Sequence, residues 1–408
     1  MAFKSLVLIP CLLTPFYCFG QLDPLDSAGL AQDLEQLITD LEEWYIYQSD
    51  KQVDFDCLRR HYFQQIEAVT NESESVLLFE YLLDEFYDSH LILNTNRKAS
   101  YRLFAPVYAT FRDEGFFLDE LWLSQMENLT VNLYGAELLA INGQDIQQAI
   151  HDFPTVCNAV ELPEIQEWIA NKLLAGRYDS PRILKLKLQD GSVLELDLDE
   201  LSIRKDTGYL SSKRIENFGY IRINNTLGEN ELIKAFDAAL APLMDTEGFI
   251  LDLRNTPGGG NTYVAKGILS RFTDEVRPFQ QHQAVERFDG ETEIGRQWLE
   301  YIVPRAPFYD KPIVVLAGRW TGSVGEGIVV GFDQFPQAQI VGTELMGLAG
   351  AMFLIDFQHR NYGYRLSLER IAQPDGTPRE QFKPKHAIRS HQIDQDRALE
   401  KALLFLKK

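Results

Sequence analysis

Hydrophobic residues recur at intervals of three and four along the first part of the chain. Three such stretches follow one another up to about residue 93. In the first of them the apolar positions are Leu30, Leu34, Leu37, Ile38, Leu41 and Trp44. This spacing places the apolar side chains on one face of a helix. The pattern therefore predicts a helical N-terminal domain over residues 21–100, whose last helix leads into Asp88-Ser89-His90.

Between residues 101 and 207 the pattern changes to short runs in which apolar and polar residues alternate. Glycine and acidic residues separate these runs, which favours β-strands joined by turns. The predicted strands lie at 107–111, 116–118, 129–133 and 135–144, and a hairpin at 182–196 turns at Asp190-Gly191. A helical stretch at 163–174 interrupts the strands. We expect residues 101–207 to form a second, β-rich domain.

From residue 208 to residue 408, apolar strand patterns alternate with helical ones. Strands are expected at 218–223, 248–253, 312–317, 339–342 and 351–357, and helices at 230–243, 262–272 and 324–332. Such alternation is typical of a largely parallel sheet covered by helices. Residues 278–300 are polar and poor in turn signals, and we interpret them as a surface excursion. The fold class is therefore α/β with several domains.

Two of the predicted strands end in turns that could build a reactive site. The segment 248–260 ends in Pro257 and three glycines, and the segment 312–326 contains Ser323. In open α/β sheets, sites form in the crevice at the carboxyl ends of the strands. A glycine turn offers backbone N–H groups, and a serine offers a hydroxyl. The backbone N–H groups could form an oxyanion hole, and the hydroxyl could be the nucleophile that faces it.

Composition and charge exclude one large class of partner. The chain has 408 residues, of which 45% are hydrophobic and 24% charged, as in ordinary globular proteins. Acidic residues outnumber basic ones by 60 to 39, so the formal net charge is −21. No basic stripe is present to neutralise phosphates, which argues against DNA or RNA as a partner.

The first 20 residues have the pattern of a signal peptide. Lys4 supplies the positive charge, residues 6–19 are almost wholly apolar, and Cys18 and Gly20 are small residues before a cut at Gln21. An uncleaved anchor or a lipoprotein signal is the alternative, although the bulky residues before Cys18 fit a lipoprotein signal poorly. No later segment approaches the ~20 apolar residues of a membrane helix. We expect export to the periplasm or the exterior.

Two cysteines remain after removal of the signal peptide, Cys57 and Cys157. In an oxidising compartment they could form a disulfide. The sequence alone cannot place their Cα atoms within bonding distance, so two separately buried thiols are an equal alternative.

The two turns resemble those of the S41 peptidases, the tail-specific or C-terminal processing proteases. Asp252-Leu-Arg-Asn-Thr-Pro-Gly-Gly259 is similar to the family's strand turn, and Thr321-Gly-Ser-Val-Gly-Glu326 to its nucleophile turn. The run 135–144 resembles an element of the family's PDZ domain. The resemblance implies a PDZ-like domain at 101–207 and an αβ protease core of the ClpP and crotonase type at 208–408. The branch most similar is that of the tricorn core and the interphotoreceptor retinoid-binding protein.

The resemblance also implies roles for single residues. Ser323 would be the nucleophile. The bacterial branch uses a lysine about 25 residues further on, but no lysine lies between Ser323 and Lys383. The tricorn-like branch uses a histidine from the helical domain, which implies His90 as the general base. The remaining implied residues are Gly258, Gly259 and Val324 as oxyanion-hole donors, and Glu380 and Ser89 as the groups that orient His90.

Simpler interpretations of these residues exist. Ser323 and Glu326 also form the pattern of a helix capping box, and we interpret Glu326 mainly as that cap. A lone histidine is more often a core or surface residue than a catalyst. The joint occurrence of His90, Ser323 and the Asp252-Leu-Arg turn favours catalysis.

These features lead to one functional expectation and one alternative. The expectation is an exported serine endopeptidase for peptides or unfolded proteins, with no cofactor and no metal. Its substrate would bind as an added strand along the PDZ-like domain or an edge of the core sheet. Leu345-Met-Gly-Leu348 would form an apolar specificity pocket. The alternative is a catalytically weak or inactive protein of the same fold that binds peptides or small apolar ligands.

Overall fold

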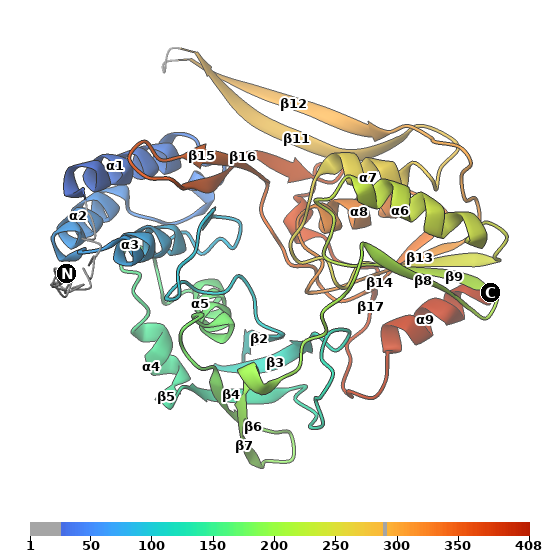
Figure 1. Cartoon of the computed structure of the whole chain (residues 1–408), viewed down its shortest axis with the longest axis horizontal. Coiled ribbons are helices and arrows are strands. Elements are labelled where there is room, and N and C mark those ends of the chain that lie inside the picture. Colours follow the sequence, from blue (N-terminus) through green and yellow to red (C-terminus); the bar gives the residue numbers. More distant parts are fainter. Residues whose placement is uncertain (1–25, 289–291) are drawn as a thin grey trace, which may run out of the picture.

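The computed structural model describes residues 26–288 and 292–408 (Figure 1). The predicted signal peptide at 1–20 lies outside the described residues. Figure 1 shows helices at the N-terminal side, a small sheet below them, and a larger helix-covered sheet on the opposite side. The α/β multi-domain fold class is confirmed. The domain boundaries at 100 and 207, and the PDZ-like character of the middle segment, stay predictions.

The N-terminal segment forms the three amphipathic helices that its periodicity predicts. They are α1 (Ser27–Glu43), α2 (Phe55–Gln65) and α3 (Glu72–Asp84). Asp26, Asp54 and Asn71 cap the helix N-termini by accepting hydrogen bonds from backbone N–H groups of the first turns. The apolar faces meet in one buried cluster. A disulfide between Cys57 and Cys157, with Cα atoms 5.6 Å apart, ties α2 to the middle segment.

The middle segment contains a sheet in the order β2-β3-β4-β6-β7, with β5 beside β4. The strands are β2 (Val107–Arg112), β3 (Gly115–Leu121), β4 (Ala136–Ile141), β5 (Gln144–Asp145), β6 (Ile183–Lys187) and β7 (Val193–Asp197). Helices α4 (Ile146–His151) and α5 (Pro163–Ala175) cover one face. Helix α5 packs along β2.

The strand predicted at 129–133 does not form. Leu129, Val131 and Leu133 pack against the core of this sheet from an irregular segment. The Asn132 side chain accepts from the N–H of Tyr134 and donates to the carbonyl of His391. Such local side-chain hydrogen bonds turn the backbone away from an extended strand. The alternation of apolar and polar residues at 129–133 comes instead from packing of this irregular segment against the core.

The large sheet has the order β17-β14-β13-β10-β9-β8. Its strands are β8 (Leu210–Ile215), β9 (Phe218–Ile223), β10 (Gly248–Asp252), β13 (Ile313–Ala317), β14 (Ala338–Gly342) and β17 (His386–Ala387). All pair in parallel except β8 with β9. Helices α6 (Glu231–Leu240), α7 (Thr262–Leu269) and α8 (Val324–Asp333) cover one face, and α9 (Arg397–Leu406) covers the other (Figure 1).

Residues 278–300, interpreted from the sequence as a surface excursion, are part of a third sheet. They belong to a long hairpin of β11 (Arg277–Phe288) and β12 (Thr292–Ile302). The sheet runs β1-β16-β11-β12, with β15 on the other edge of β16. Its further strands are β1 (Ile92–Leu93), β15 (Ala351–Asp356) and β16 (Gly363–Ala372). Much of the hairpin is exposed, so its sequence lacks the apolar alternation that reveals a half-buried strand.

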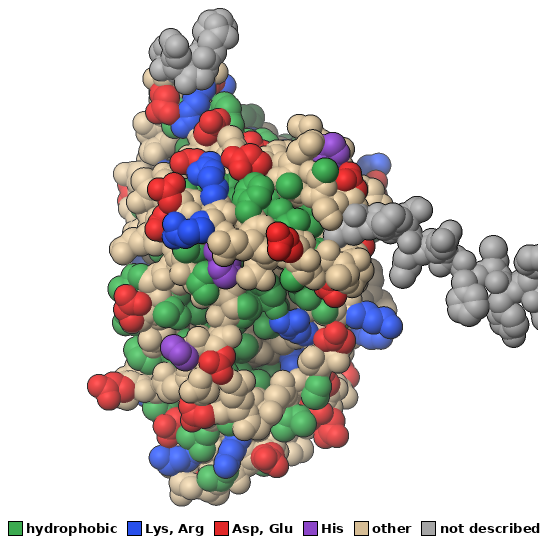
Figure 2. All heavy atoms as spheres, turned by 90° about the vertical axis from the view of Figure 1, so that its left-hand side faces the viewer, with side chains coloured by type: hydrophobic (Ala, Val, Ile, Leu, Met, Phe, Trp, Pro, Cys, Tyr) green, Lys and Arg blue, Asp and Glu red, His purple; other side chains and the backbone are tan. Residues whose placement is uncertain are grey.

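Charged side chains are mixed on the face that carries the N-terminal helices. Figure 2 shows Lys and Arg scattered among acidic side chains there, with no large basic patch. Within the described part of the chain, no helix is both long enough and apolar enough to cross a bilayer.

Candidate active site

The two turns predicted to face each other lie side by side. Strands β10 and β13 are parallel neighbours, so their carboxyl ends meet at one edge of the sheet. The N–H of Thr256 donates to the carbonyl of Trp320 at 3.0 Å, and the N–H of Gly322 donates to the carbonyl of Thr256 at 3.1 Å. The glycine turn and the serine turn are therefore joined by backbone hydrogen bonds.

Ser323 occupies a sharp turn between β13 and α8. Its backbone has φ 50° and ψ −112°, which is unusual for a residue with a side chain. Gly322, just before Ser323, and Gly325, two residues after it, leave the room that this turn needs. A Cβ at Gly322 would lie 2.8 Å from the Pro257 carbonyl oxygen, and one at Gly325 would lie 2.6 Å from Oγ1 of Thr256. Such strained strand-to-helix turns present a serine hydroxyl for reaction.

The carboxylate of Glu326 binds backbone N–H groups of this turn and of a neighbouring loop. Its buried carboxylate accepts from the N–H of Ser323 at 2.8 Å, of Gly347 at 2.7 Å and of Leu348 at 3.3 Å. Burial raises the pKa of Glu326 to about 7, although the charge of Arg379 and these N–H groups act against the shift. The cap role expected for Glu326 is thus extended, because the same carboxylate also binds the loop at 347–348.

His90 is 2% exposed and enters the site from the segment after α3. Its Nδ1 lies 2.7 Å from the carbonyl oxygen of Ala349. Because a carbonyl only accepts, Nδ1 carries the proton and Nε2 is left with a lone pair. Nε2 is buried and has no hydrogen-bond partner among the described residues. Burial lowers the pKa of His90 to about 4. The charge of Asp88 and the Ala349 carbonyl act against this shift, whereas the charges of Arg379 and Arg365 add to it.

One cleft of about 660 Å³ brings Ser323 and His90 together. They come from segments far apart in the chain, one from the N-terminal part and one from the core. Ser89, Gly258, Met346 and Leu348 also line the cleft. The expectation that the 345–348 segment lies near the nucleophile therefore holds for two of its residues, while Leu345 is buried in the core.

The two residues expected to orient His90, Ser89 and Glu380, have other neighbours. The hydroxyl of Ser89 accepts a hydrogen bond from the indole N–H of Trp168 at 3.1 Å. Glu380 lies beside Tyr47. Burial raises the pKa of the Tyr47 hydroxyl, and the negative charge of Glu380 raises it further. The structure brings neither side chain into hydrogen-bond contact with His90 among the described residues. The Ala349 carbonyl occupies Nδ1 instead, and a backbone atom leaves no signal in the sequence.

The expected oxyanion donors also differ from one another. The N–H of Gly258 already donates to Oδ1 of Asn225 at 2.7 Å. The N–H of Gly259 makes only a long contact of 3.5 Å, to the carbonyl of Thr256. A Cβ at Gly259 would lie 2.6 Å from the Cβ of Ser323, so this glycine backbone directly adjoins the serine. Val324 is the first residue of α8, where N–H groups have no intrahelical acceptor.

Comparison with known proteins agrees with this arrangement. Residues 217–388, which include both turns, match the model of peptidase family S41. This segment of the chain is an S41 peptidase segment, and the match supports a serine-type peptidase, a hydrolase.

Solved structures share the fold of this chain over most of its length. Mature CPAF superposes with a TM-score of 0.60 at 15% identity, covering 94% of this chain and 96% of that chain. The photosystem II D1 C-terminal processing protease gives a TM-score of 0.55 at 14% identity, covering 88% and 93%. A putative peptidase from Parabacteroides merdae gives 0.54 at 17% identity, covering 93% and 97%. At these identities the likeness concerns the fold.

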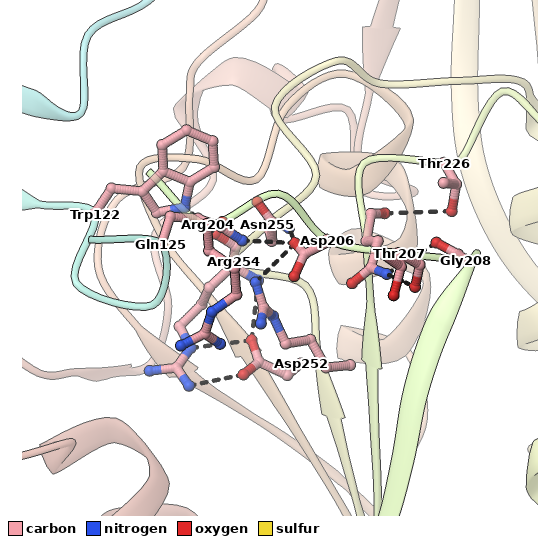
Figure 3. Close-up of polar contacts among 12 residues, drawn as sticks. Trp122, Gln125, Arg204, Asp206, Thr207, Gly208, Thr226, Asp252, Arg254 and Asn255 are labelled. Atoms are coloured by element: carbon pink, nitrogen blue, oxygen red, sulfur yellow. Dashed lines mark hydrogen bonds and ion pairs between the residues drawn. The ribbon is translucent and has the colours of Figure 1, made fainter. Parts of the chain in front are cut away.

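In this peptidase, the Asp252-Leu-Arg segment fixes the glycine turn to its surroundings (Figure 3). Arg254 pairs with Asp252 at 2.7 Å and with Asp396 at 2.8 Å, and its carbonyl accepts from the indole of Trp122 at 2.9 Å. Asp206, in the connection from the middle segment, accepts from Gln125 and pairs with Arg222. These contacts join the middle segment to the carboxyl ends of the core strands.

Three further residues support the site but were not expected from the sequence. They are Asn225, Ala349 and Arg379. Arg379 is buried, donates to the carbonyls of Leu348 and Gly350, and lies 3.9 Å from Glu326. Its position next to Glu380 was the only available signal. Within the described ranges, no group of three or more His, Cys, Asp or Glu residues is arranged to hold a metal ion.

Proposed function

We propose that this protein is an exported serine endopeptidase in which Ser323 is the nucleophile and His90 is the general base. One observation carries the proposal. Ser323, on a strained turn, and His90, with Nδ1 engaged and Nε2 buried without a partner, line the same cleft. A serine hydroxyl needs a base to attack at neutral pH, and a neutral imidazole with a bare Nε2 is such a base.

The proposed reaction uses only groups of this chain. Ser323 Oγ attacks the peptide carbonyl while His90 Nε2 takes its proton. The N–H groups of Gly259 and Val324 stabilise the oxyanion, and Gly258 contributes only if Asn225 releases its N–H. His90 returns the proton to the leaving amine, and water then hydrolyses the acyl-enzyme with His90 again as the base. The Ala349 carbonyl keeps the imidazole oriented throughout.

Export is supported by the disulfide. A bond between Cys57 and Cys157 persists in an oxidising compartment and is uncommon in the cytosol. It agrees with the signal-like pattern of residues 1–20.

A non-catalytic binding protein is the second candidate. The observation that favours it is that, among the described residues, no carboxylate is hydrogen-bonded to the imidazole of His90; the Asp88 carboxylate accepts only from the backbone N–H of His90. The mainly apolar lining of the cleft would suit a bound peptide or small apolar ligand equally well.

Covalent labelling with a fluorophosphonate distinguishes the two candidates. We expect the wild-type protein to be labelled, and Ser323→Ala and His90→Ala to lose the label. Ser211→Ala, at an exposed serine of β8, and His386→Ala, on β17, are matched controls that should keep it. A folded wild-type protein that takes no label would contradict the catalytic proposal and favour the binding protein.

The low pKa of His90 predicts an unusual pH profile. The base must be neutral, so kcat/KM should rise as the pH increases through about 4 and be level by pH 5 to 6. An unperturbed histidine would give the same rise near 6.5. The measurement is kcat/KM between pH 3.5 and 8. Glu326 titrates near 7, so the profile is repeated with Glu326→Gln; a rise near 6.5 retained in that variant would contradict the prediction.

A further inference from the structure

Strand β2 forms one wall of the cleft and is an edge strand. In its sheet it pairs only with β3, so its other edge faces away from the sheet. Val107, Tyr108 and Phe111 of β2 line the cleft together with Ser323 and His90. An open edge in this position would be a ready site for a substrate peptide to add as a further strand.

Helix α5 closes that edge with side chains. The amide of Asn171 accepts from the N–H of Ala109 at 2.9 Å and donates to the carbonyl of Ala109 at 2.8 Å. It therefore offers Ala109 the same donor and acceptor that a residue of an added strand would offer. Glu167 completes the closure, because its carboxylate accepts from the N–H of Phe111 at 2.9 Å and from the hydroxyl of Tyr108 at 2.6 Å.

The closure is itself held in place. Asn171 Nδ2 also donates to the carbonyl of Glu167 one turn earlier in α5, at 2.8 Å. A peptide strand could reach Ala109 only by breaking both bonds of Asn171, and reach Phe111 only by displacing a carboxylate. Displacement would leave the Glu167 carboxylate without its two donors, which is costly for a partly buried charge.

What this wall offers to a substrate is apolar surface. The larger apolar side chains of β2, of the residues before it and of α5 that line the cleft include Leu103, Phe104, Val107, Phe111 and Trp168. Leu103 is 63% exposed, although it is a large aliphatic residue. Apolar surface of this kind recognises side chains, whereas backbone recognition needs open N–H and C=O groups.

We propose that the wall of β2 and α5 selects substrates by a bulky apolar side chain and does not bind their backbone by strand addition. The substrate class is thus a peptide with a large aliphatic or aromatic residue near the cleaved bond. The inference rests on the proposed function in that it takes the ligand of the cleft to be a peptide. It replaces the expectation of strand addition along the middle domain.

Binding to the Ser323→Ala protein tests the proposal without requiring hydrolysis. The probes are fluorescent decapeptides of Gly, Ser and Thr, one set with a single Phe at successive positions and one peptide with none. We expect the best Phe peptide to bind about tenfold more tightly than the peptide without Phe, as burial of one aromatic side chain implies. Leu103→Ser should remove most of that difference, and Leu404→Ser, at an exposed leucine of α9, should not.

A second arm examines the closed edge. If peptides add to β2 as strands, methylating the backbone nitrogens on either side of the Phe should weaken binding of the best Phe peptide about fivefold or more, because an added strand needs those N–H groups. We expect the methylated peptide to bind the Ser323→Ala protein within about twofold of the unmethylated one. Weakening by about fivefold or more, or an equal affinity of the peptides with and without Phe, would overturn the proposal. Labelling of Ser323 is measured separately, so a failure of the catalytic proposal remains distinguishable.

Discussion

Replacing Ser323 by alanine is expected to lower kcat for an unstructured protein substrate on the order of 10⁶-fold, the effect known for the nucleophile of another serine protease. The loss follows because the other hydroxyl in the turn between β13 and α8, that of Thr321, is buried and donates to the carbonyl of Leu253, so it cannot replace that of Ser323. His90→Ala should have an effect of similar size, since the serine would lose the group that accepts its proton. The measurement is steady-state turnover of a denatured, fluorescently labelled protein.

The combination of both substitutions sharpens this prediction. If Ser323 and His90 act as one unit, the double variant should be no slower than either single variant, because each removes the same catalytic step. Losses that multiply in the double variant would show that the two residues act independently and would contradict the proposed mechanism. Ser211→Ala and His386→Ala serve as controls for the residue type and should turn over at the wild-type rate.

Replacing Glu326 by alanine is expected to lower the free energy of unfolding by about 3–5 kcal/mol and to remove most of the activity. Three backbone N–H groups would lose their acceptor inside the protein, and the buried Arg379 would lose its nearby carboxylate. The same carboxylate holds Ser323 and the loop whose Ala349 carbonyl binds His90. Activity should therefore fall further than stability alone explains. Urea denaturation and turnover at a temperature where the variant is folded measure the two effects.

Two further variants serve as comparisons for Glu326→Ala. Glu326→Gln should lose less stability than the alanine variant, because one amide oxygen still accepts either from Ser323 or from the 347–348 loop. Glu231→Ala removes an exposed first-turn glutamate of α6 and should change stability by no more than about 0.5 kcal/mol. A Glu326→Ala protein as stable and as active as the wild type would reduce Glu326 to an ordinary helix cap.

Much of the fold could be predicted because its signals are local. The three N-terminal helices and the alternating strands and helices of the core follow from apolar spacing, and the turn after β4 follows from Asn142-Gly143, both with positive φ. The prediction was wrong at 129–133, where packing of a loop imitates strand alternation. It also gave no strands for 278–300, because an exposed hairpin buries too little apolar surface to leave a period in the sequence.

The sequence by itself determined the helices, the parallel core and the two turns, because apolar periodicity and glycine-rich turns are local properties of the chain. It also pointed to Ser323 and His90, which the structure places in one cleft. Only the tertiary structure decided which groups form hydrogen bonds with the polar atoms around the site. Ala349 binds His90 through a backbone carbonyl, Asn225 takes the N–H of Gly258, and Asn171 closes the edge of β2. Each partner comes from a distant segment, and hydrogen bonding between distant segments leaves no pattern in either of them.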